Sequence, residues 1–417
     1  MRSVLIALML VLGAMPVGAD QTPSANESQD WPALISQLRD RVDRVAGDAQ
    51  TRQQLAIAYN NYAVSLAEKG RSEDAIDQLE EGLRIDPTNA QLRRNLVMIC
   101  LKAAQEAYQV HRIAEAKRLV NQAITASPAD AEPYVLLGEI EYNAQRLKEA
   151  KAAWEKALAI QPNLPEVRTK LDQLNHELPV ESNFEKLSQA YFDLRYTSAL
   201  ERGSGFDLQD MLLTARREVG SDFAFWPTRK IVVLIYSAEE FRKLRQQAPE
   251  WVAGQYDGKI RLPLPGQGVD QATVRRILYH EYTHALVYEL TKGRLPLWFN
   301  EGLAEYEAWK HDTPAWILLR QALAAKQVLP WAALSDQFAA GKPASTVGLA
   351  YEQAHSIVRY LIERYSFWRI KRILKAVGSG ETSFDEAFQA HYRLKPARLE
   401  EQWWEWLLET LSTSTIP

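Results

Sequence analysis

Two histidines and two glutamates have the residue types and spacing of a metal-dependent hydrolytic site. His-Glu-Tyr-Thr-His occupies 280–284, and Glu301 follows seventeen residues after the second histidine. On a helix, His280 and His284 project from the same face, so two imidazoles can meet on one zinc ion. Glu301 can supply a third ligand from another segment, which leaves the fourth position for water. Glu281 lies beside the first histidine, where it can take a proton from that water as general base.

The alternative for this motif is an ordinary helix with two solvated or half-buried histidines. The chain has only seven histidines in 417 residues, so a chance His-Glu-x-x-His is rare. Ionisable groups among aliphatic side chains are costly to bury without partners, and a metal ion is such a partner. Apolar residues recur at helical spacing over 274–290: Val274, Ile277, Leu278, Tyr282, Ala285 and Leu286. We therefore expect a buried, zinc-binding helix here.

Length and composition predict two domains in an exported protein. A chain of 417 residues exceeds the usual size of a single core, and its net charge of −4 indicates no nucleic-acid partner. Arg2, the apolar stretch 4–15 and small residues before Asp20 predict a signal peptide at 1–19, hence a periplasmic or secreted bacterial protein. The alternative is an uncleaved anchor; no membrane span is expected after signal cleavage.

Cys100 is the single cysteine, so we expect no internal disulfide and a small buried side chain.

The segment 55–177 carries internal repeats. Small and aromatic residues recur before Pro87, Pro128 and Pro162, and the last two prolines are 34 residues apart. Pro87 and Pro128 are 41 residues apart, and the seven residues beyond the 34-residue period equal about two helical turns. They predict a longer first helix in the middle repeat. These segments resemble tetratricopeptide (TPR) repeats. The resemblance implies an α-helical solenoid that presents a surface to a protein partner. The alternative is that the repeats only space or stabilise the other domain.

Composition changes after the repeats. Residues 20–54 are expected to hold a linker and one helix, and another helix is expected at 166–177. The second domain is predicted to cover 178–417, because ten of the twelve tryptophans lie beyond residue 220. Its last part, after 269, is predicted to be almost entirely helical. Three strands are expected, at 192–198, at 230–236 and, as an edge strand with prolines, at 259–264.

Strands followed by a His-Glu-x-x-His helix resemble the zincin fold. Glu301, in Trp-Phe-Asn-Glu-Gly-Leu-Ala, makes the ligand set similar to that of the gluzincins. The segments 256–260 and 298–306 further resemble the bacterial peptidase MA-like group. The longer metzincin pattern is excluded, because Val287 and Leu290 stand where it has glycine and histidine. The resemblance implies a mostly α protein with a small β-sheet: a TPR solenoid followed by an α+β, thermolysin-like zincin domain.

The resemblance also implies how the residues of the site act. His280, His284 and Glu301 would bind Zn²⁺, and Glu281 would be general base and then proton donor to the leaving amine. Glu305 lies one helical turn after Glu301 and would orient a ligand histidine by accepting a hydrogen bond from the ring nitrogen that does not bind the metal. The alternative for Glu305 is a surface carboxylate.

Further residues are expected around the metal. Tyr351 resembles a tyrosine that donates to the developing oxyanion, with His355 one turn later as an alternative donor and a plain core tyrosine as another. The approach to the site would be formed by Tyr256, Asp257 and Gly258. A substrate would then lie along the edge strand at 259–262 and pair with its backbone.

Two functions remain open from the sequence. The first is an exported zinc-dependent metallopeptidase that hydrolyses peptide bonds in peptide or protein substrates, with the TPR repeats docking a protein partner. The second is a binding or assembly scaffold whose zincin domain is structural or inactive. Glu281 favours the peptidase, because a purely structural zinc needs no base.

Overall fold

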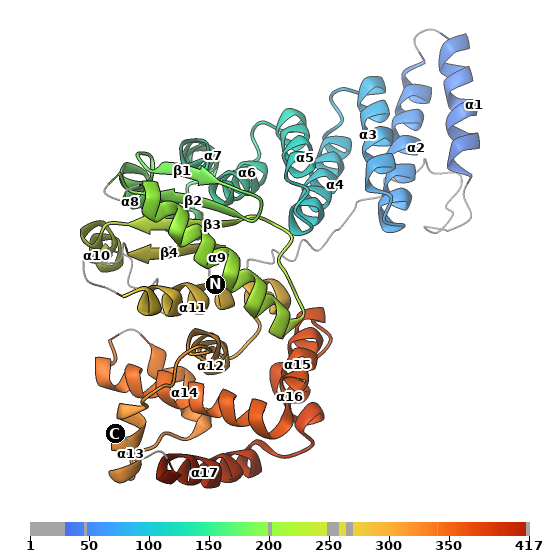
Figure 1. Ribbon diagram of the computed structural model, residues 1–417. Helices are drawn as coiled ribbons and strands as arrows, with labels where there is room; N and C mark the ends of the chain where they lie inside the picture. Colours follow the sequence, from blue (N-terminus) through green and yellow to red (C-terminus); the bar gives the residue numbers. More distant parts are fainter. Residues whose placement is uncertain are drawn as a thin grey trace. The chain divides into compact units, whose positions relative to one another are not determined.

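The described residues are mostly helical with one small sheet, as the sequence predicted (Figure 1). The computed structural model describes residues 30–45, 48–198, 202–247, 258–263, 270–339 and 341–413. The predicted signal segment therefore lies outside the described residues, as do Tyr256 and Asp257. The chain divides between Leu178 and Pro179 into two compact units. Within the described ranges, no helix is long and apolar enough to cross a bilayer.

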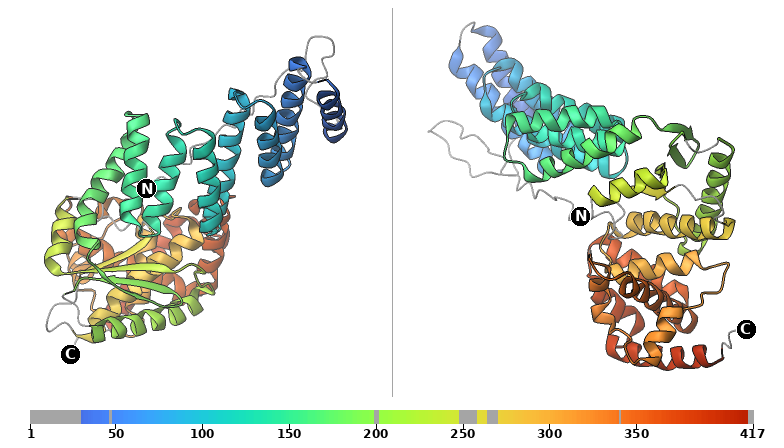
Figure 2. Two further views of the ribbon diagram at one scale, coloured as in Figure 1. Left: turned by 90° about the horizontal axis from the view of Figure 1, so that it is seen from above. Right: turned by 90° about the vertical axis from the view of Figure 1, so that its left-hand side faces the viewer.

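The first unit is a row of helices (Figure 2). Its helices are α1 (Trp31–Arg44), α2 (Ala49–Glu68), α3 (Ser72–Ile85), α4 (Ala90–Gln109), α5 (Ile113–Ala126), α6 (Glu132–Asn143), α7 (Leu147–Ile160) and α8 (Pro165–Glu181), the last of which runs past the division. Helices α2 and α3, α4 and α5, and α6 and α7 form three closely packed pairs. Helices α2 and α4 have 20 residues each and α6 has 12, so the first helix of the middle repeat is longer than that of the last repeat, as predicted, but not longer than that of the first.

The turn inside each pair repeats one backbone conformation. Gly70, His111 and Gln145 have φ of 75°, 62° and 59°, in the left-handed region. In each case the following arginine donates its backbone N–H to a carbonyl five residues earlier: Arg71 to Leu66, Arg112 to Ala107, and Arg146 to Glu141. Such bonds close the last turn of the preceding helix. The three turns are 41 and 34 residues apart, the spacings seen between the prolines.

Small and paired side chains let these helices approach. A Cβ on Gly138 would lie 2.2 Å from Nε1 of Trp154, so only glycine fits there. Asn95 donates to the side-chain oxygen of Asn60 at 2.7 Å, which satisfies two fully buried amides between neighbouring pairs. Cys100 is buried, as expected, and burial raises the pKa of its thiol to about 12.

A four-stranded sheet opens the second unit, in the order β1-β2-β3-β4. Its strands are β1 (Glu185–Ser188), β2 (Phe192–Tyr196), β3 (Ile231–Tyr236) and β4 (Lys259–Pro263). Strand β1 is antiparallel to β2, whereas β2, β3 and β4 are parallel. Parallel neighbours need crossover connections, and α9 (Arg202–Phe223) and α10 (Ala238–Gln247) lie in them. Strand β4 is at the edge, as its prolines predicted.

Both faces of the sheet are covered. Helices α9 and α11 (Gln271–Thr291) lie over one face, where Val233 and Leu286 belong to the main core (Figure 1). On the other face, Leu234 packs in a smaller cluster with Leu244 of α10. This coverage explains why β3 is buried along its whole length.

Helices complete the second unit and surround α14. They are α12 (Leu297–Ala308), α13 (Ile317–Ala324), α14 (Ala344–Tyr365), α15 (Phe367–Ser379), α16 (Phe384–Tyr392) and α17 (Pro396–Thr413), with short 3-10 turns η2 (Trp331–Ala333) and η3 (Ser335–Phe338). Helix α12 packs against both α11 and α14. This packing brings the segment with Glu301 beside the helix with the two histidines.

Candidate metal centre

Helix α11 carries the His-Glu-x-x-His segment in its middle. The side chain of Asp270 accepts the backbone N–H of Thr273 at 2.7 Å and so begins the helix. Lys292, with φ of 54°, ends it in the left-handed conformation. With 21 residues between these caps, the motif is held away from the fraying ends.

One face of α11 enters the core and another is left open. Leu278 and Tyr282 are buried, as predicted. The expectation that Ile277 belongs to the same buried face was wrong, because its side chain is 40% exposed. Ile277 lies one turn before Glu281, on the side of the helix that the core does not cover. The motif therefore sits at the border between core and solvent.

Three ligand atoms converge at this border. Nε2 of His280 lies 3.0 Å from Nε2 of His284. Oε2 of Glu301, delivered by α12, lies 3.4 Å from the first nitrogen and 3.3 Å from the second. In the part of the chain that the structure describes, this is the group of three His, Cys, Asp or Glu side chains that could share an ion. The structure thus brings all three predicted ligands together.

The donor set and its spacing fit zinc. Tetrahedral zinc with bonds of about 2.0–2.1 Å places its ligand atoms about 3.3 Å apart, close to the separations found here. Both carboxylate oxygens of Glu301 are buried, and the two imidazoles at 3.3–3.4 Å are their only polar neighbours among the described residues. A buried carboxylate with no other hydrogen-bond donor is costly unless a cation compensates it.

The electrostatics of the site also favour a cation. Burial alone would lower the pKa of His280, but hydrogen bonds and charge from Glu301 and Glu305 raise it well above its usual value. Burial would raise the pKa of Glu301, but the charges and hydrogen bonds of His284 and His280 hold it below its usual value. Both shifts have the same cause, because the carboxylates favour positive charge on the imidazoles and the imidazoles favour negative charge on Glu301.

The far nitrogen of each imidazole is also in contact with a side chain. Oε1 of Glu305 lies 3.0 Å from Nδ1 of His280, and Nε1 of Trp309 donates to the other oxygen of Glu305 at 2.9 Å. Nδ2 of Asn300 lies 3.0 Å from Nδ1 of His284. With its amide turned over, Asn300 would accept the Nδ1–H that a metal-binding Nε2 leaves on that ring. Sequence reasoning had assigned no role to Asn300, although it directly precedes Glu301.

Glu281 and Tyr351 lie beside the ligands. Glu281 leaves α11 next to His280, is partly exposed, and forms no hydrogen bond or ion pair with any described residue. The ring of Tyr351, on α14, lies 6.1 Å from that of His280 and 5.0 Å from that of Phe338. His355 is placed differently. It is 3% exposed and accepts a hydrogen bond from Nε1 of Trp316 at 3.4 Å, and burial lowers its pKa to about 4.

Of the residues expected to form the substrate approach, the structure describes Gly258. Its φ of 103° suits glycine, and it leads directly into β4. Tyr256 and Asp257 stay predictions.

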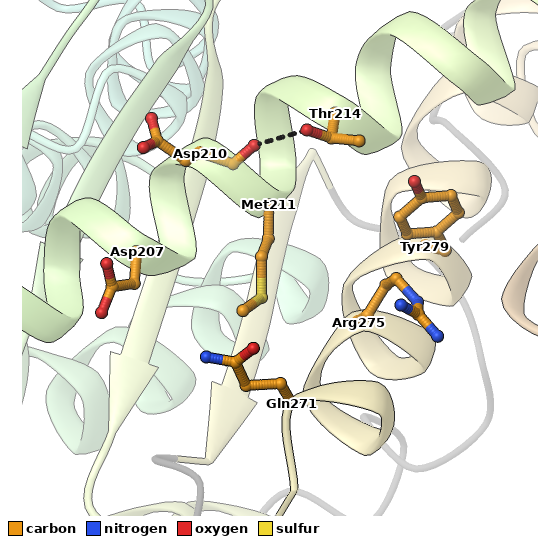
Figure 3. A pocket seen from close by; sticks show the side chains of 7 residues that line it. All are labelled: Asp207, Asp210, Met211, Thr214, Gln271, Arg275 and Tyr279. Carbon is orange, nitrogen blue, oxygen red and sulfur yellow. Dashed lines mark hydrogen bonds between the residues drawn. The ribbon is translucent and has the colours of Figure 1, made fainter. Parts of the chain in front are cut away.

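A separate cavity of about 320 Å³ lies between α9 and α11 (Figure 3). Asp207, Asp210 and Met211 line it from α9, and Arg275 and Tyr279 line it from α11. None of the predicted metal ligands lines this cavity, so it is not part of the candidate centre.

Comparisons with known proteins agree with this architecture. Residues 229–409 match the sequence model of the Peptidase MA superfamily. Residues 56–89 and 131–164 each match a tetratricopeptide repeat model. No curated protein matches the chain.

Two solved structures have limited similarity to the chain. "MamA RS-1 ArsTM double mutant" is 20% identical over 35% of this chain and 75% of its own, with a TM-score of 0.21. "MamA 41-end from Desulfovibrio magneticus RS-1" is 19% identical over 36% of this chain and 87% of its own, with a TM-score of 0.22. TM-scores this low support no further argument.

The family matches confirm the resemblance drawn from the two motif segments and from the repeats. The chain carries a Peptidase MA superfamily domain preceded by tetratricopeptide repeats.

Proposed function

We propose that the second unit is a zinc-dependent peptidase domain and that the repeats dock a protein partner. The observation that carries the proposal is the convergence of His280, His284 and Glu301, whose ligand atoms lie 3.0–3.4 Å apart. Glu281 lies beside them and forms no hydrogen bond or ion pair with a described residue. The superfamily match supports a metallopeptidase in general terms. The substrate would be a peptide or a protein.

Zinc held by these three residues would polarise a peptide carbonyl and lower the pKa of a bound water. Glu281 is placed to accept a proton from that water and to return it to the leaving amine. The hydroxyl of Tyr351 would donate to the oxygen that becomes negative in the tetrahedral intermediate. Glu305 and Asn300 would keep the two imidazoles in the orientation that binding requires.

The edge strand would hold the substrate. Strand β4 is the last strand of the described sheet, and α11 packs beside it. An extended peptide added along β4 would gain backbone hydrogen bonds and could reach the open side of the motif helix. Gly258, Asp257 and Tyr256 would lie at the beginning of this path.

The proposal is tested by metal content and cleavage together. Purified protein should hold one zinc per chain, and it should cleave members of a peptide library in a chelator-sensitive way. Glu281→Gln should still bind zinc while cleavage falls by about 10²–10⁴-fold, the usual contribution of a general base. Glu381→Gln, an exposed glutamate between α15 and α16, is the matched control and should cleave normally. A protein without zinc, or a fully active Glu281→Gln variant, would refute the peptidase.

The scaffold alternative predicts a different pattern. A partner captured through the repeats, with capture unaffected by Glu281→Gln and with no cleavage by the wild type, would favour it. Export is also part of our proposal, because residues 1–19 have the composition of a signal peptide. Fusing this segment to a reporter that is active only in the periplasm would test it.

A further inference from the structure

Helix α15 has two opposite faces of different character. Ile370, Ile373, Leu374 and Val377 are at most 1% exposed and belong to the core of the second unit. Trp368, by contrast, is 45% exposed on the outer face. Single exposed apolar side chains are common on protein surfaces, so the significance of Trp368 depends on the residues around it.

The outer face of α15 is also basic. Residues 364–380 contain five cations and no acidic residue, in a chain whose net charge is −4. Lys371, Arg372 and Lys375 lie within one or two turns of Trp368 and share its side of the helix. Neither these three nor Arg364, at the end of α14, form an ion pair with any residue that the structure describes. We call Arg364, Trp368, Lys371, Arg372 and Lys375 the α15 surface.

Two guanidinium groups lie close to the exposed ring. Those of Arg369 and Arg372 lie 5.0 Å and 5.3 Å from the ring centre of Trp368. Such contacts favour the outward orientation of the ring while the cations stay near solvent. Helix α16 packs on α15 (Figure 1), and the guanidinium of Arg369 donates to the backbone carbonyl of His391 at the end of α16. There, burial and then the charges of Arg372 and Arg369 lower the pKa of His391.

We propose that the α15 surface docks the protein on an anionic membrane. Unpaired lysines and arginines are attracted by the negative potential of acidic lipid headgroups, with about 1 kcal/mol for each residue near the surface. The tryptophan ring, apolar with one polar N–H, prefers the depth of those headgroups. An amphipathic helix with a basic outer face is typical of such contacts.

An acidic protein partner fits the surface less well. Lysine is depleted in protein–protein interfaces, whereas membranes attract lysine and arginine alike. Lys371 and Lys375 of the α15 surface form no ion pair with a described residue, and Trp368 is the single aromatic ring beside them.

Vesicle binding tests the proposal. The full chain is incubated with neutral phosphatidylcholine vesicles and with vesicles that contain phosphatidylglycerol, and the bound fractions are compared after sedimentation. The anionic-to-neutral ratio is the readout, because the apolar stretch at 4–15 would bind both kinds of vesicle. We expect a ratio well above one that falls toward one as salt is raised.

Matched variants locate the contact. Arg372→Glu with Lys375→Glu should lower the ratio about tenfold or more, since two attractions are lost and two repulsions added. Lys326 and Lys342 are two exposed lysines elsewhere in the second unit. Lys326→Glu with Lys342→Glu changes the net charge equally and should lower the anionic-to-neutral ratio only slightly. Trp368→Ala should weaken binding to anionic vesicles several-fold. Trp404 on α17 is 36% exposed, and Trp404→Ala should leave that binding unchanged.

Three outcomes would overturn the inference. The first is wild-type protein with no preference for anionic vesicles. In the second, the Arg372/Lys375 variant binds as the Lys326/Lys342 control does. In the third, the chain binds polyglutamate through Arg372 and Lys375 but ignores vesicles, which would assign the surface to an acidic protein. None of these outcomes depends on peptidase activity, so the inference stands or falls separately from the proposed function.

Discussion

Gly302 couples the packing of two helices to the position of a metal ligand. It follows Glu301 on α12, where a Cβ would lie 2.6 Å from the carbonyl oxygen of Ala354 and 2.7 Å from Cγ2 of Val358, both on α14. A backbone oxygen cannot move away as the end of a flexible side chain can. Gly302→Ala must therefore push α12 and α14 apart, and Glu301 moves with α12.

The expected magnitude follows from two opposing terms. Replacing glycine by alanine inside a helix stabilises it by about 0.5–1 kcal/mol. Forcing a methyl group into a filled contact costs about 1–3 kcal/mol. Because the contact at Gly302 is with backbone, we expect the upper part of this range and a net loss of about 1–2 kcal/mol. Gly205 on α9 is the matched control, since its Cβ would meet Tyr196 at an ordinary 3.6 Å and the same substitution should be neutral or slightly stabilising.

Urea unfolding followed by tryptophan fluorescence measures this difference. Ten of the twelve tryptophans lie beyond residue 220, so the signal reports mainly on the second unit. With chelator present, Gly302→Ala should lower the midpoint while Gly205→Ala keeps or raises it. Competition with a chelator should then show weaker zinc binding for Gly302→Ala, whereas Gly205→Ala should bind zinc as the wild type does. Equal midpoints for Gly302→Ala and wild type, or equal losses in the two variants, would show that the contact between α12 and α14 is not as tight as the structure has it.

Other predictions concern single side chains. Glu305→Ala should weaken zinc binding about 10–100-fold in chelator competition, because His280 loses the partner of its far nitrogen; unchanged affinity would remove that role. Tyr351→Phe should lower kcat about 10²-fold with little change in KM, and an unchanged kcat would make it a core tyrosine. Burial raises the pKa of Glu307 from 4.5 to about 8, so the folded protein binds this proton more tightly than the unfolded chain does. Stability should therefore fall as pH rises between these values, and Glu307→Gln should flatten that fall in urea titrations with chelator; parallel curves would contradict it.

The sequence could predict what depends on short-range spacing. His280 and His284 share a helix face whatever the rest of the fold does, and prolines restrict a strand such as β4 to the edge. The repeat periodicity likewise follows from residues 34 positions apart, because each repeat packs on the next one along the chain. These features are visible without knowing the tertiary structure.

What the sequence could not predict depends on contacts between distant segments. The exposure of Ile277 is set by where the core ends, not by the apolar periodicity of α11. Strand β1 and helix α9 were not anticipated, because their patterns are weak and their pairing partners are remote. Asn300 acquires its contact with His284 only through the packing of α12 on α11.

The same distinction applies within the candidate centre. Its two histidines are set by one turn of α11, so their spacing should survive most changes elsewhere in the unit. Glu301 reaches them only because α12 is held between α11 and α14. A metal that binds all three residues would therefore favour the packed arrangement over any in which α12 has moved, and would stabilise the second unit by mass action. All three predicted ligands lie between residues 280 and 301, so this stabilisation would act on the second unit and not directly on the repeats.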